Sequence, residues 1–481
     1  MLTIRPSCSD PCSRRAFLRV GAAGLGAMSL SRLLRGGEPA GKPWVRDKSV
    51  VWLWLGGGPP QAETWDPKPD APSGVGTMFG VVRTSLPGVT FGSHFPKLAA
   101  RAHRLAIVRS FQTPCSDHQD NFVRAMLTGT QAKLAPSVGS VYAFLRGNNH
   151  PRSGMPTYMV LDSGNNTEFL QEHFLRGNTP GELSDAFAPF NPSGSIIPLP
   201  EQNGPRRKPD GEVTFSPLLK SMELRLPADR WDRRKELLRQ LDAATRTVES
   251  DRALATHDGY REQAYQVLQG SMSEAFRLDR EDPKTIERYD TSDILLTCPN
   301  FLKLPDFPRR RSLLGRQMLL ARRLCEAGAG LVMVENCGWD FHGGDGLNPN
   351  VKAGLDGFGP SLDRAVSAFL DDVRDRGLED RILLVVCGEM GRTPKINASG
   401  GRDHWPKLAP LFLAGGGYRM GQVIGQSDAQ GGQPATTPVT HAQLASTVLQ
   451  TLVDPTKLRL FPNIRPDLLR RVEENPIPNL S

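Results

Sequence analysis

Residues 329–342 have the sequence AGLVMVENCGWDFH, an apolar run that is followed closely by an aspartate and a histidine. The run is continuous and does not alternate with polar residues, which is typical of a strand buried on both faces of a parallel sheet. Asp340 and His342 would then lie just beyond the carboxyl end of that strand. A carboxylate and an imidazole in this position either cap a turn or bind a metal ion.

The same apolar pattern recurs along the chain and predicts an α/β fold. Besides 329–335, we expect strands at residues 49–55, 104–110, 156–161, 381–387 and 410–415. We expect the helices to lie at residues 137–147, 313–327, 359–376 and 440–453. Strands that alternate with helices in this way form a largely parallel central sheet with helices on its faces.

Two stretches interrupt this alternation. Residues 162–212 are rich in Gly, Asn and Pro, and we expect long surface loops there. Residues 200–310 combine polar loops with two expected helices, at 230–248 and 259–277, and we interpret them as an insertion or cap on the sheet. The sequence therefore predicts one α/β domain at residues 45–460, followed by a C-terminal tail at 461–481.

The first 37 residues resemble an export signal. Arg14 and Arg15 precede Phe17, Leu18 and a short Gly/Ala-rich apolar stretch, which is the pattern of a twin-arginine (Tat) leader. A basic amphipathic helix is the alternative interpretation. The apolar stretch is shorter than the roughly 20 residues that cross a bilayer, so we expect no stable transmembrane span. We expect the Tat export machinery as a partner and a periplasmic or secreted location, with tethering to the membrane if the leader is not cleaved.

The charge and the cysteines exclude two classes of protein. The net charge is +8, but residues 1–35 hold six arginines and one aspartate, so the leader carries +5 and the remainder only +3. Nucleic-acid binding requires a concentrated basic face, so we expect no nucleic-acid partner. The seven cysteines contain no CxxC pair, which argues against a zinc ribbon. Cys325, Cys337 and Cys387 lie in apolar runs and are expected to be buried.

Polar residues that could carry out chemistry are concentrated after four of the predicted strands. They are Glu63 and Asp66; Cys115, Ser116 and His118; Asp340 and His342; and Glu389, Arg392, Asp403 and His404. Ligands of open α/β sheets bind at the carboxyl ends of the strands. Each residue alone could be a helix cap or a hydrogen-bonded side chain, but together the carboxylates and imidazoles favour a divalent metal site. We also expect the glycines of LGGGPP, residues 55–60, to let the backbone approach a ligand closely.

Longer stretches of the chain resemble a known family. They are GGGPPQAETWDPKP at residues 56–69, GEMGRTPKIN at 388–397, GRDHWP at 401–406 and HAQLASTVLQTL at 441–452. By these motifs and its leader the chain resembles the DUF1501 family, which is grouped with the alkaline phosphatase–sulfatase superfamily. The resemblance implies an alkaline-phosphatase-like sandwich with a mostly parallel central sheet, and a divalent metal ion such as Zn, Mn or Ca.

The resemblance also implies how the candidate ligands are divided between two metal sites. The first would consist of Asp340, His342 and His404, and the second of Glu389 with help from Glu63, Asp66 or Asp403. The chain departs from the sulfatases at their nucleophile, because Gln119 stands where those enzymes have a cysteine.

These features predict an exported metal-dependent hydrolase of sulfate or phosphate esters, with an anionic ester, such as a sulfated polysaccharide, as its substrate. Arg392 and Arg402 could brace the anionic group, since guanidinium forks match its geometry. His118 could act as the general acid. Ser116 or Cys115 could be the nucleophile, or a metal-activated water could replace it.

The same residues also allow a simpler interpretation. Arg392 could form a surface salt bridge, and His118 could form a hydrogen bond within its turn. The aromatic rings at the strand ends could either stack on sugars or pack in the core; they are Trp65, Trp339 and Trp405. The second hypothesis for the whole chain is a non-catalytic, metal-stabilised binding or scaffold protein of the same fold, because the sulfatase nucleophile is missing.

Overall fold

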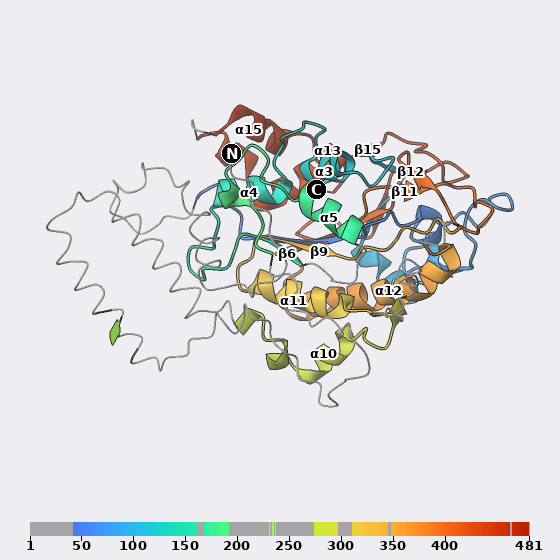
Figure 1. The fold of residues 1–481 in the computed structure, drawn as a ribbon, viewed down its shortest axis with the longest axis horizontal. Helices are drawn as coiled ribbons and strands as arrows, with labels where there is room; N and C mark the ends of the chain where they lie inside the picture. Colours follow the sequence, from blue (N-terminus) through green and yellow to red (C-terminus); the bar gives the residue numbers. More distant parts are fainter. Residues whose placement is uncertain are drawn as a thin grey trace.

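The computed structural model describes residues 42–161, 168–191, 274–296, 310–344, 348–461 and 464–480, with residues 230, 233, 234 and 236 besides. A seven-stranded sheet lies at its centre, in the order β14-β4-β13-β10-β1-β9-β6 (Figure 1). These strands are β1 (Ser49–Trp54), β4 (Ala106–Val108), β6 (Tyr158–Leu161), β9 (Leu331–Glu335), β10 (Ile382–Cys387), β13 (Leu411–Gly415) and β14 (Gln422–Ile424). Only β13 runs antiparallel to its neighbours, so the predicted mostly parallel α/β sheet is confirmed.

All six predicted strands belong to this sheet, and the structure adds a seventh. The seventh strand, β14, pairs with β4 at the edge of the sheet. Two of its three residues are partly exposed, so it lacks the continuous apolar run that marks the other strands. Edge strands need to bury less surface than central ones, which is why the apolar pattern did not reveal this one.

Helices cover both faces of the sheet (Figure 1). On one face, Val51 and Leu53 of β1 belong to the same core as α11 (Leu314–Glu326) and α12 (Val351–Asp375). On the other face, Trp52 and Trp54 belong to a second core with α4 (Val138–Arg146) and α13 (His441–Leu452). Because successive side chains of a strand point to opposite faces, burial on both faces requires an unbroken apolar run.

The four predicted helices of the main domain are present, but α12 begins eight residues before its predicted start at 359. Its first turns contain glycines, and Pro360 lies inside it, a composition that normally marks a break. The helix nevertheless begins at Val351, because the side chain of Asn350 caps it by accepting a hydrogen bond from the Ala353 amide.

Part of the predicted loop region is helical, which corrects the prediction for residues 162–212. Helix α5 (Glu168–Gly177) lies against α3 (Asp120–Thr128), and its Phe174 ring lies 6.0 Å from the ring of Trp54. In the predicted C-terminal tail, α15 (Pro466–Glu473) packs on α13. The helices expected at 230–248 and 259–277 lie largely outside the described residues, as does the leader at 1–37.

The remaining elements are short. They are β2 (Val81–Arg83), β3 (Thr90–Gly92), β5 (Phe111–Gln112), β7 (Leu295–Leu296), β8 (Arg310–Arg311), β11 (Gly391–Arg392), β12 (His404–Trp405), β15 (Val439–Thr440), α2 (Pro96–Ala99), α10 (Pro283–Tyr289) and α14 (Pro455–Leu458), with 3-10 turns η2 (Gln61–Glu63), η3 (Ala102–Arg104), η4 (Asp185–Phe187) and η5 (Leu278–Arg280). Across the described part of the chain, every helix is too short or too polar to cross a bilayer.

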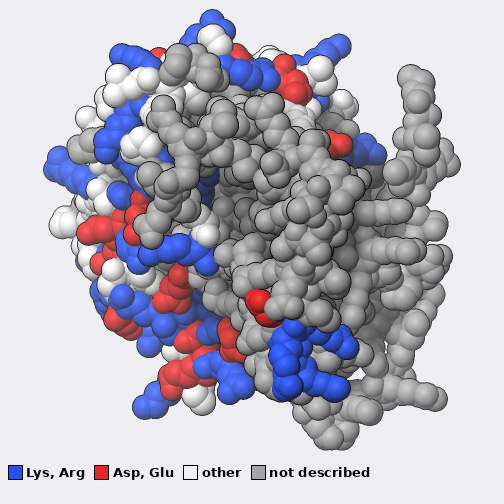
Figure 2. Space-filling model, turned by 90° about the vertical axis from the view of Figure 1, so that its left-hand side faces the viewer, with Lys and Arg blue, Asp and Glu red and all other residues white. Residues whose placement is uncertain are grey.

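Basic and acidic side chains are interspersed over the described surface in Figure 2. Several exposed charges of the protein lie close to a partner: Arg288 lies 2.9 Å from Asp375, and Arg364 lies 2.5 Å from Asp293. The cysteines expected to be small buried side chains, Cys325, Cys337 and Cys387, are buried, which confirms that expectation.

Candidate metal centre

The topology brings the polar loops that follow β1, β9 and β10 to one edge of the sheet. These three strands are adjacent and parallel, so their carboxyl ends lie together. Asp340 and His342 follow β9. His404 reaches the same place from β12, which pairs with β11 so that His404 lies opposite Arg392. His118 reaches it from the loop between β5 and α3.

Four side chains meet there. His118, Asp340, His342 and His404 can each offer one ligand atom such that all these atoms lie within 4.8 Å of one another. The three imidazoles present Nε2 to the same carboxylate oxygen, Asp340 Oδ1, at 3.4, 2.8 and 3.8 Å respectively. His118 and Asp340 are buried, whereas the His342 and His404 side chains are 23% and 22% exposed. The cluster is therefore closed toward the sheet and open toward solvent at the two outer histidines.

The opposite ring nitrogen, Nδ1, of each imidazole lies near an oxygen atom. These oxygens are Glu389 Oε1 for His118 (2.7 Å), the Ser116 carbonyl for His404 (3.2 Å) and Asp403 Oδ1 for His342 (3.6 Å). The first two distances are hydrogen bonds, and the third is a looser contact. An imidazole whose Nδ1–H donates to an oxygen presents the lone pair of Nε2, which is the form that binds a metal.

The cluster shifts the pKa values of its members. Burial alone would raise the pKa of Asp340, but the Arg392 guanidinium and hydrogen bonds from the imidazoles hold it well below its usual range. Burial alone would lower the pKa of His118, but the carboxylates of Asp340 and Glu389 on either side of its ring outweigh burial and raise the pKa to about 9. Burial lowers the pKa of His404, and Asp340 opposes that effect only in part. The Asp340 carboxylate is therefore ionised and available as a ligand.

The donor set fits a divalent transition metal. His118 Nε2 is buried and faces the centre of the cluster, yet it has no hydrogen-bond partner within the part of the chain that the structure describes. Three imidazole nitrogens and one carboxylate oxygen suit Zn²⁺ and similar ions, whereas Ca²⁺ prefers six to eight oxygens. Of the three metals considered from the sequence, calcium fits these side chains least.

Four carboxylates considered as ligands from the sequence lie outside the cluster: Glu63, Asp66, Glu389 and Asp403. Glu389 bonds to His118 instead, and Asp403, whose side chain is 60% exposed, only approaches His342. The Asp66 carboxylate is bound by Lys68 at 3.0 Å, Arg109 at 3.2 Å and the Ser427 hydroxyl. Among the described residues the side chains that could hold a metal thus form one group, which contains His118 and none of these carboxylates.

Arg392 is placed to hold Asp340 and does not face a ligand. Its side chain is fully buried, and its guanidinium donates to the carbonyls of Gly57, Gly58 and Arg402 and to Asp340 Oδ1 at 2.5 Å. Its expected contact with an anionic ester therefore does not fit the structure, because its donors already have protein partners.

Arg402 is equally buried. It donates to the carbonyls of Thr393, Pro394 and Gly76 and pairs with Glu63 Oε1 at 2.7 Å. It therefore joins Glu63 to the β11–β12 hairpin and offers no open face to an anion.

The candidate nucleophiles differ in their access to solvent. Ser116 is exposed and adjoins His404 through its carbonyl. Cys115 is fully buried, its Sγ lies 3.1 Å from the Phe122 carbonyl, and burial raises the pKa of its thiol well above the usual range. Cys115 is therefore a structural thiol.

The aromatic rings near the cluster are mostly part of the core. Trp65 and Trp339 are fully buried. Trp405 is half-buried and donates to the Gly432 carbonyl. Stacking of a sugar on Trp65 or Trp339 is therefore incompatible with this structure.

The glycines of residues 55–60 allow a close approach, but to the protein's own backbone. Gly57 has φ +107°, and a Cβ there would lie 2.6 Å from the Asp340 amide nitrogen. Its own N–H donates to Glu389 Oε1 at 2.8 Å. The loop thus supports the residues around the cluster, which corrects the expectation that it would contact a ligand.

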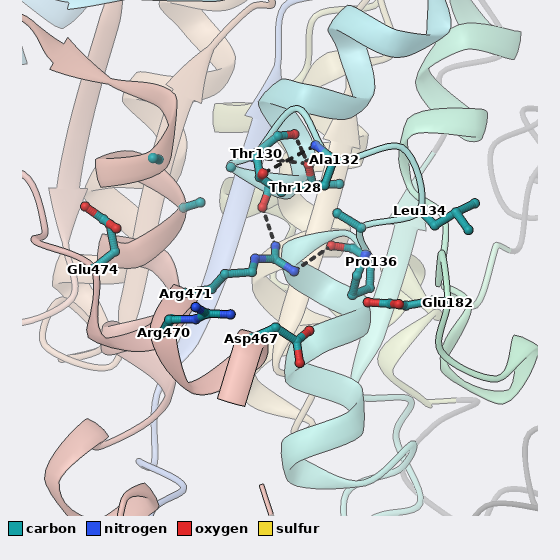
Figure 3. A pocket seen from close by; sticks show the side chains of 14 residues that line it. Thr128, Thr130, Ala132, Leu134, Pro136, Glu182, Asp467, Arg470, Arg471 and Glu474 are labelled. Carbon is teal, nitrogen blue, oxygen red and sulfur yellow. Dashed lines mark hydrogen bonds between the residues drawn. The ribbon is translucent and has the colours of Figure 1, made fainter. Parts of the chain in front are cut away.

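A cavity of about 390 Å³ lies at the other end of α3, among α3, α13 and α15 (Figure 3). Arg471 reaches into it and donates to the carbonyls of Thr128 and Pro136, with Asp467 and Glu182 nearby (Figure 3). The cavity contains none of the four clustered side chains, so it is separate from the candidate metal centre.

The comparisons with known proteins concern almost the whole chain. A sequence model of the family described as "Protein of unknown function (DUF1501)" matches residues 47–480. No curated protein matches the sequence.

Three solved structures illustrate the overall similarity of fold. A sulfatase from Pseudoalteromonas sp. is 10% identical over 91% of this chain and 72% of its own, with a TM-score of 0.36. A phosphonate monoester hydrolase from Silicibacter pomeroyi is 10% identical over 84% and 73%, with a TM-score of 0.36. An alkaline phosphatase from the Antarctic bacterium TAB5 is 10% identical over 79% and 94%, with a TM-score of 0.30.

Proposed function

Since this chain belongs to the DUF1501 family, whose description assigns no activity, we propose from the site itself that it is an exported metal-dependent hydrolase of sulfate or phosphate esters. The observation that carries the proposal is the convergence of three imidazole Nε2 atoms on Asp340 Oδ1. Arg392 already pairs with Asp340, so an ordinary ion pair does not explain why three imidazoles also face this carboxylate. A divalent cation bound between the four groups would explain it.

The four clustered side chains would hold the metal, which when bound supplies Lewis acidity and lowers the pKa of a bound water. Asp340 would contribute a negative charge, and Arg392 fixes its carboxylate by the 2.5 Å contact. The partly exposed side of His342 and His404 is where an ester could approach. Ser116, which is exposed beside His404, is the nearest candidate nucleophile on the chain.

Export by the Tat machinery and a sulfated polysaccharide substrate are further parts of this proposal. The first rests on the twin arginines at 14 and 15, which lie outside the described residues. The second rests on the expectation of an anionic ester. Of the rings expected to contact a sugar, only Trp405 retains exposed surface.

A second candidate function is a metal-stabilised binding or scaffold protein without catalysis. Structural zinc sites usually have four protein ligands, whereas catalytic sites keep one position open. His118, Asp340, His342 and His404 together provide four. If all four side chains bind the metal at once, no coordination position stays open for a substrate or water. Four protein ligands would therefore favour this alternative over catalysis.

Metal content and turnover together test both functions. We would measure bound metal by elemental analysis in the full chain and in Asp340→Ala and His404→Ala variants, and assay aryl sulfates and aryl phosphates with each. Asp403→Asn is the matched control, because Asp403 adjoins His342 but lies outside the cluster.

The hydrolase proposal requires stoichiometric metal and turnover in the wild type and in Asp403→Asn, with both lost in the other two variants. Metal without turnover would favour the scaffold. If the wild type binds no metal from a metal-replete solution, both functions are ruled out.

A further inference from the structure

We propose that Glu389 is a positioning residue that fixes the imidazole of His118 for metal binding, and that it is not itself a ligand. The inference rests on the proposed metal site. It concerns a carboxylate that directly follows β10, on the loop beside the central strand.

Only one of the two carboxylate oxygens of Glu389 has hydrogen-bond partners among the described residues. Its side chain is 2% exposed, and its Oε1 atom accepts from the Gly57 amide at 2.8 Å and lies 2.7 Å from His118 Nδ1. Its Oε2 atom is buried and has no hydrogen-bond partner among the described residues. A carboxylate in such a place costs free energy unless a positive charge lies near it.

The charges around Glu389 indicate where that positive charge belongs. Asp340 and Glu389 contribute −2, and Arg392, the buried cation that contacts Asp340, contributes +1, which leaves −1. The imidazole of His118 lies between the two carboxylates, with Nδ1 toward Glu389 and Nε2 toward Asp340. A cation bound at Nε2 would offset the excess negative charge. Glu389 therefore contacts the cluster through the His118 side chain.

The other two imidazoles lack an equivalent anchor. The acceptor near His342 Nδ1 is Asp403, at 3.6 Å and 60% exposed. The acceptor for His404 Nδ1 is the neutral Ser116 carbonyl at 3.2 Å. A metal-bound histidine whose second nitrogen donates to a carboxylate is oriented and more basic. His118 is thus the one imidazole of the cluster whose Nδ1 atom contacts a buried carboxylate.

Gly57 supports this arrangement from both of its backbone groups. Its N–H donates to Glu389, and its carbonyl accepts from Arg392, which contacts Asp340. Gly57 therefore forms hydrogen bonds with Glu389 and Arg392. Glu389 in turn contacts His118, and Arg392 contacts Asp340. This explains why a glycine with φ +107° lies beneath the site.

The test compares three variants by their affinity for Zn²⁺, measured by competition with a chelator of known affinity. Glu389→Leu removes both acceptor oxygens, whereas Glu389→Gln keeps one and loses the charge. Glu63→Gln is the matched control: Glu63 and Glu389 are both fully buried, but Glu63 pairs with Arg402 and touches no clustered side chain.

We expect Glu389→Leu to bind Zn²⁺ about 10- to 100-fold more weakly than the wild type. We expect Glu389→Gln to lie between the two, and Glu63→Gln to bind as the wild type does, even if it is less stable. Wild-type affinity in Glu389→Leu, or an equal loss in Glu63→Gln, would overturn the inference.

Metal-free crystal structures of the wild type and Glu389→Leu separate this inference from the proposed function. We expect the His118 imidazole to leave the cluster in the variant. If it stays in place, Glu389 does not position it, whatever the metal affinity. If the wild type binds no Zn²⁺, the proposed function fails, and the position of His118 still decides the role of Glu389.

Discussion

The Nε2 atoms of His342 and His404 lie 2.9 Å apart, although the two residues are 62 positions apart in the chain. Two imidazoles can share such a contact only if one carries a proton between them, whereas a cation can accept both lone pairs. Both atoms also face Asp340 Oδ1. The geometry therefore fits either a proton held between the two rings or a cation bound by both.

Zinc is expected to stabilise the folded protein. At a free concentration one hundred times its dissociation constant, a ligand specific for the native state adds about 2.7 kcal/mol. The melting temperature should therefore rise with Zn²⁺ and fall again with a chelator, as followed by circular dichroism. His404→Ala should show no such shift. An equal rise in that variant would mean that the zinc binds elsewhere.

Gly57→Ala is expected to destabilise the protein by about 2 to 4 kcal/mol, through backbone strain and the clash with the Asp340 amide. Gly74→Ala is the control, because Gly74 also has positive φ, at +79°, but a Cβ there meets nothing within 4 Å. It should cost only about 1 kcal/mol. Urea denaturation of the two variants measures the difference. Equal losses would show that the close approach at Gly57 is unimportant.

The stability of the protein is expected to fall as the pH is lowered from about 4.5 to about 2, in part because of Glu281. Burial alone would raise the pKa of Glu281, but its hydrogen bonds to Arg323 and Arg322 lower it to about 2 from 4.5. A carboxylate with a depressed native pKa stabilises the fold above its unfolded pKa, and loses that contribution as pH falls through the native value. The full shift corresponds to about 3 kcal/mol, and screening by solvent reduces the contribution to about 1 to 2 kcal/mol.

Glu281→Gln should remove this part of the pH dependence and lower the stability at neutral pH. Urea denaturation at several pH values measures both effects. Asp293→Asn is the control, since the Asp293 side chain is 63% exposed in its contact with Arg364, and surface pairs contribute little. A parallel pH profile in the wild type and Glu281→Gln would contradict the prediction.

Cys115 is expected to resist alkylation in the native protein. Its side chain is fully buried and its pKa is raised, so it presents neither access nor a thiolate. Peptide mapping after iodoacetamide treatment, with and without urea, measures the labelling of this residue. In a Ser116→Cys variant the exposed neighbouring position should react rapidly. Similar rates at positions 115 and 116 would show that the loop opens readily.

The strands could be predicted because the central sheet is buried on both faces. Each predicted strand, such as 381–387, has an unbroken apolar run that no half-exposed strand requires. The edge strand β14 lacked this signal. The sequence did not reveal where α12 begins, because its glycines and Pro360 oppose helix formation locally. Packing between α12 and α11 overrides that local preference.

The location of the candidate site could be predicted, but the roles of its residues could not. Asp340, His342 and His404 follow strands, and the topology brings such positions together. The contact between His118 and Glu389 joins residues 271 positions apart, and no local pattern shows which of the two faces the cluster. The burial of Arg392 could not be foreseen either, because its partners are carbonyls of a distant loop.

The order of strands in the sheet has a consequence for biosynthesis. β1 is the first strand of the sheet to be translated, yet it pairs on both sides with strands translated much later, β9 and β10. A ribosome that adds 5 to 20 residues per second needs roughly 15 to 70 s to pass from Trp54 to Cys387. Until β9 and then β10 are made, the backbone of β1 lacks its native strand partners on both sides. During synthesis β1 is therefore an unpaired apolar strand that can pair with a non-native partner.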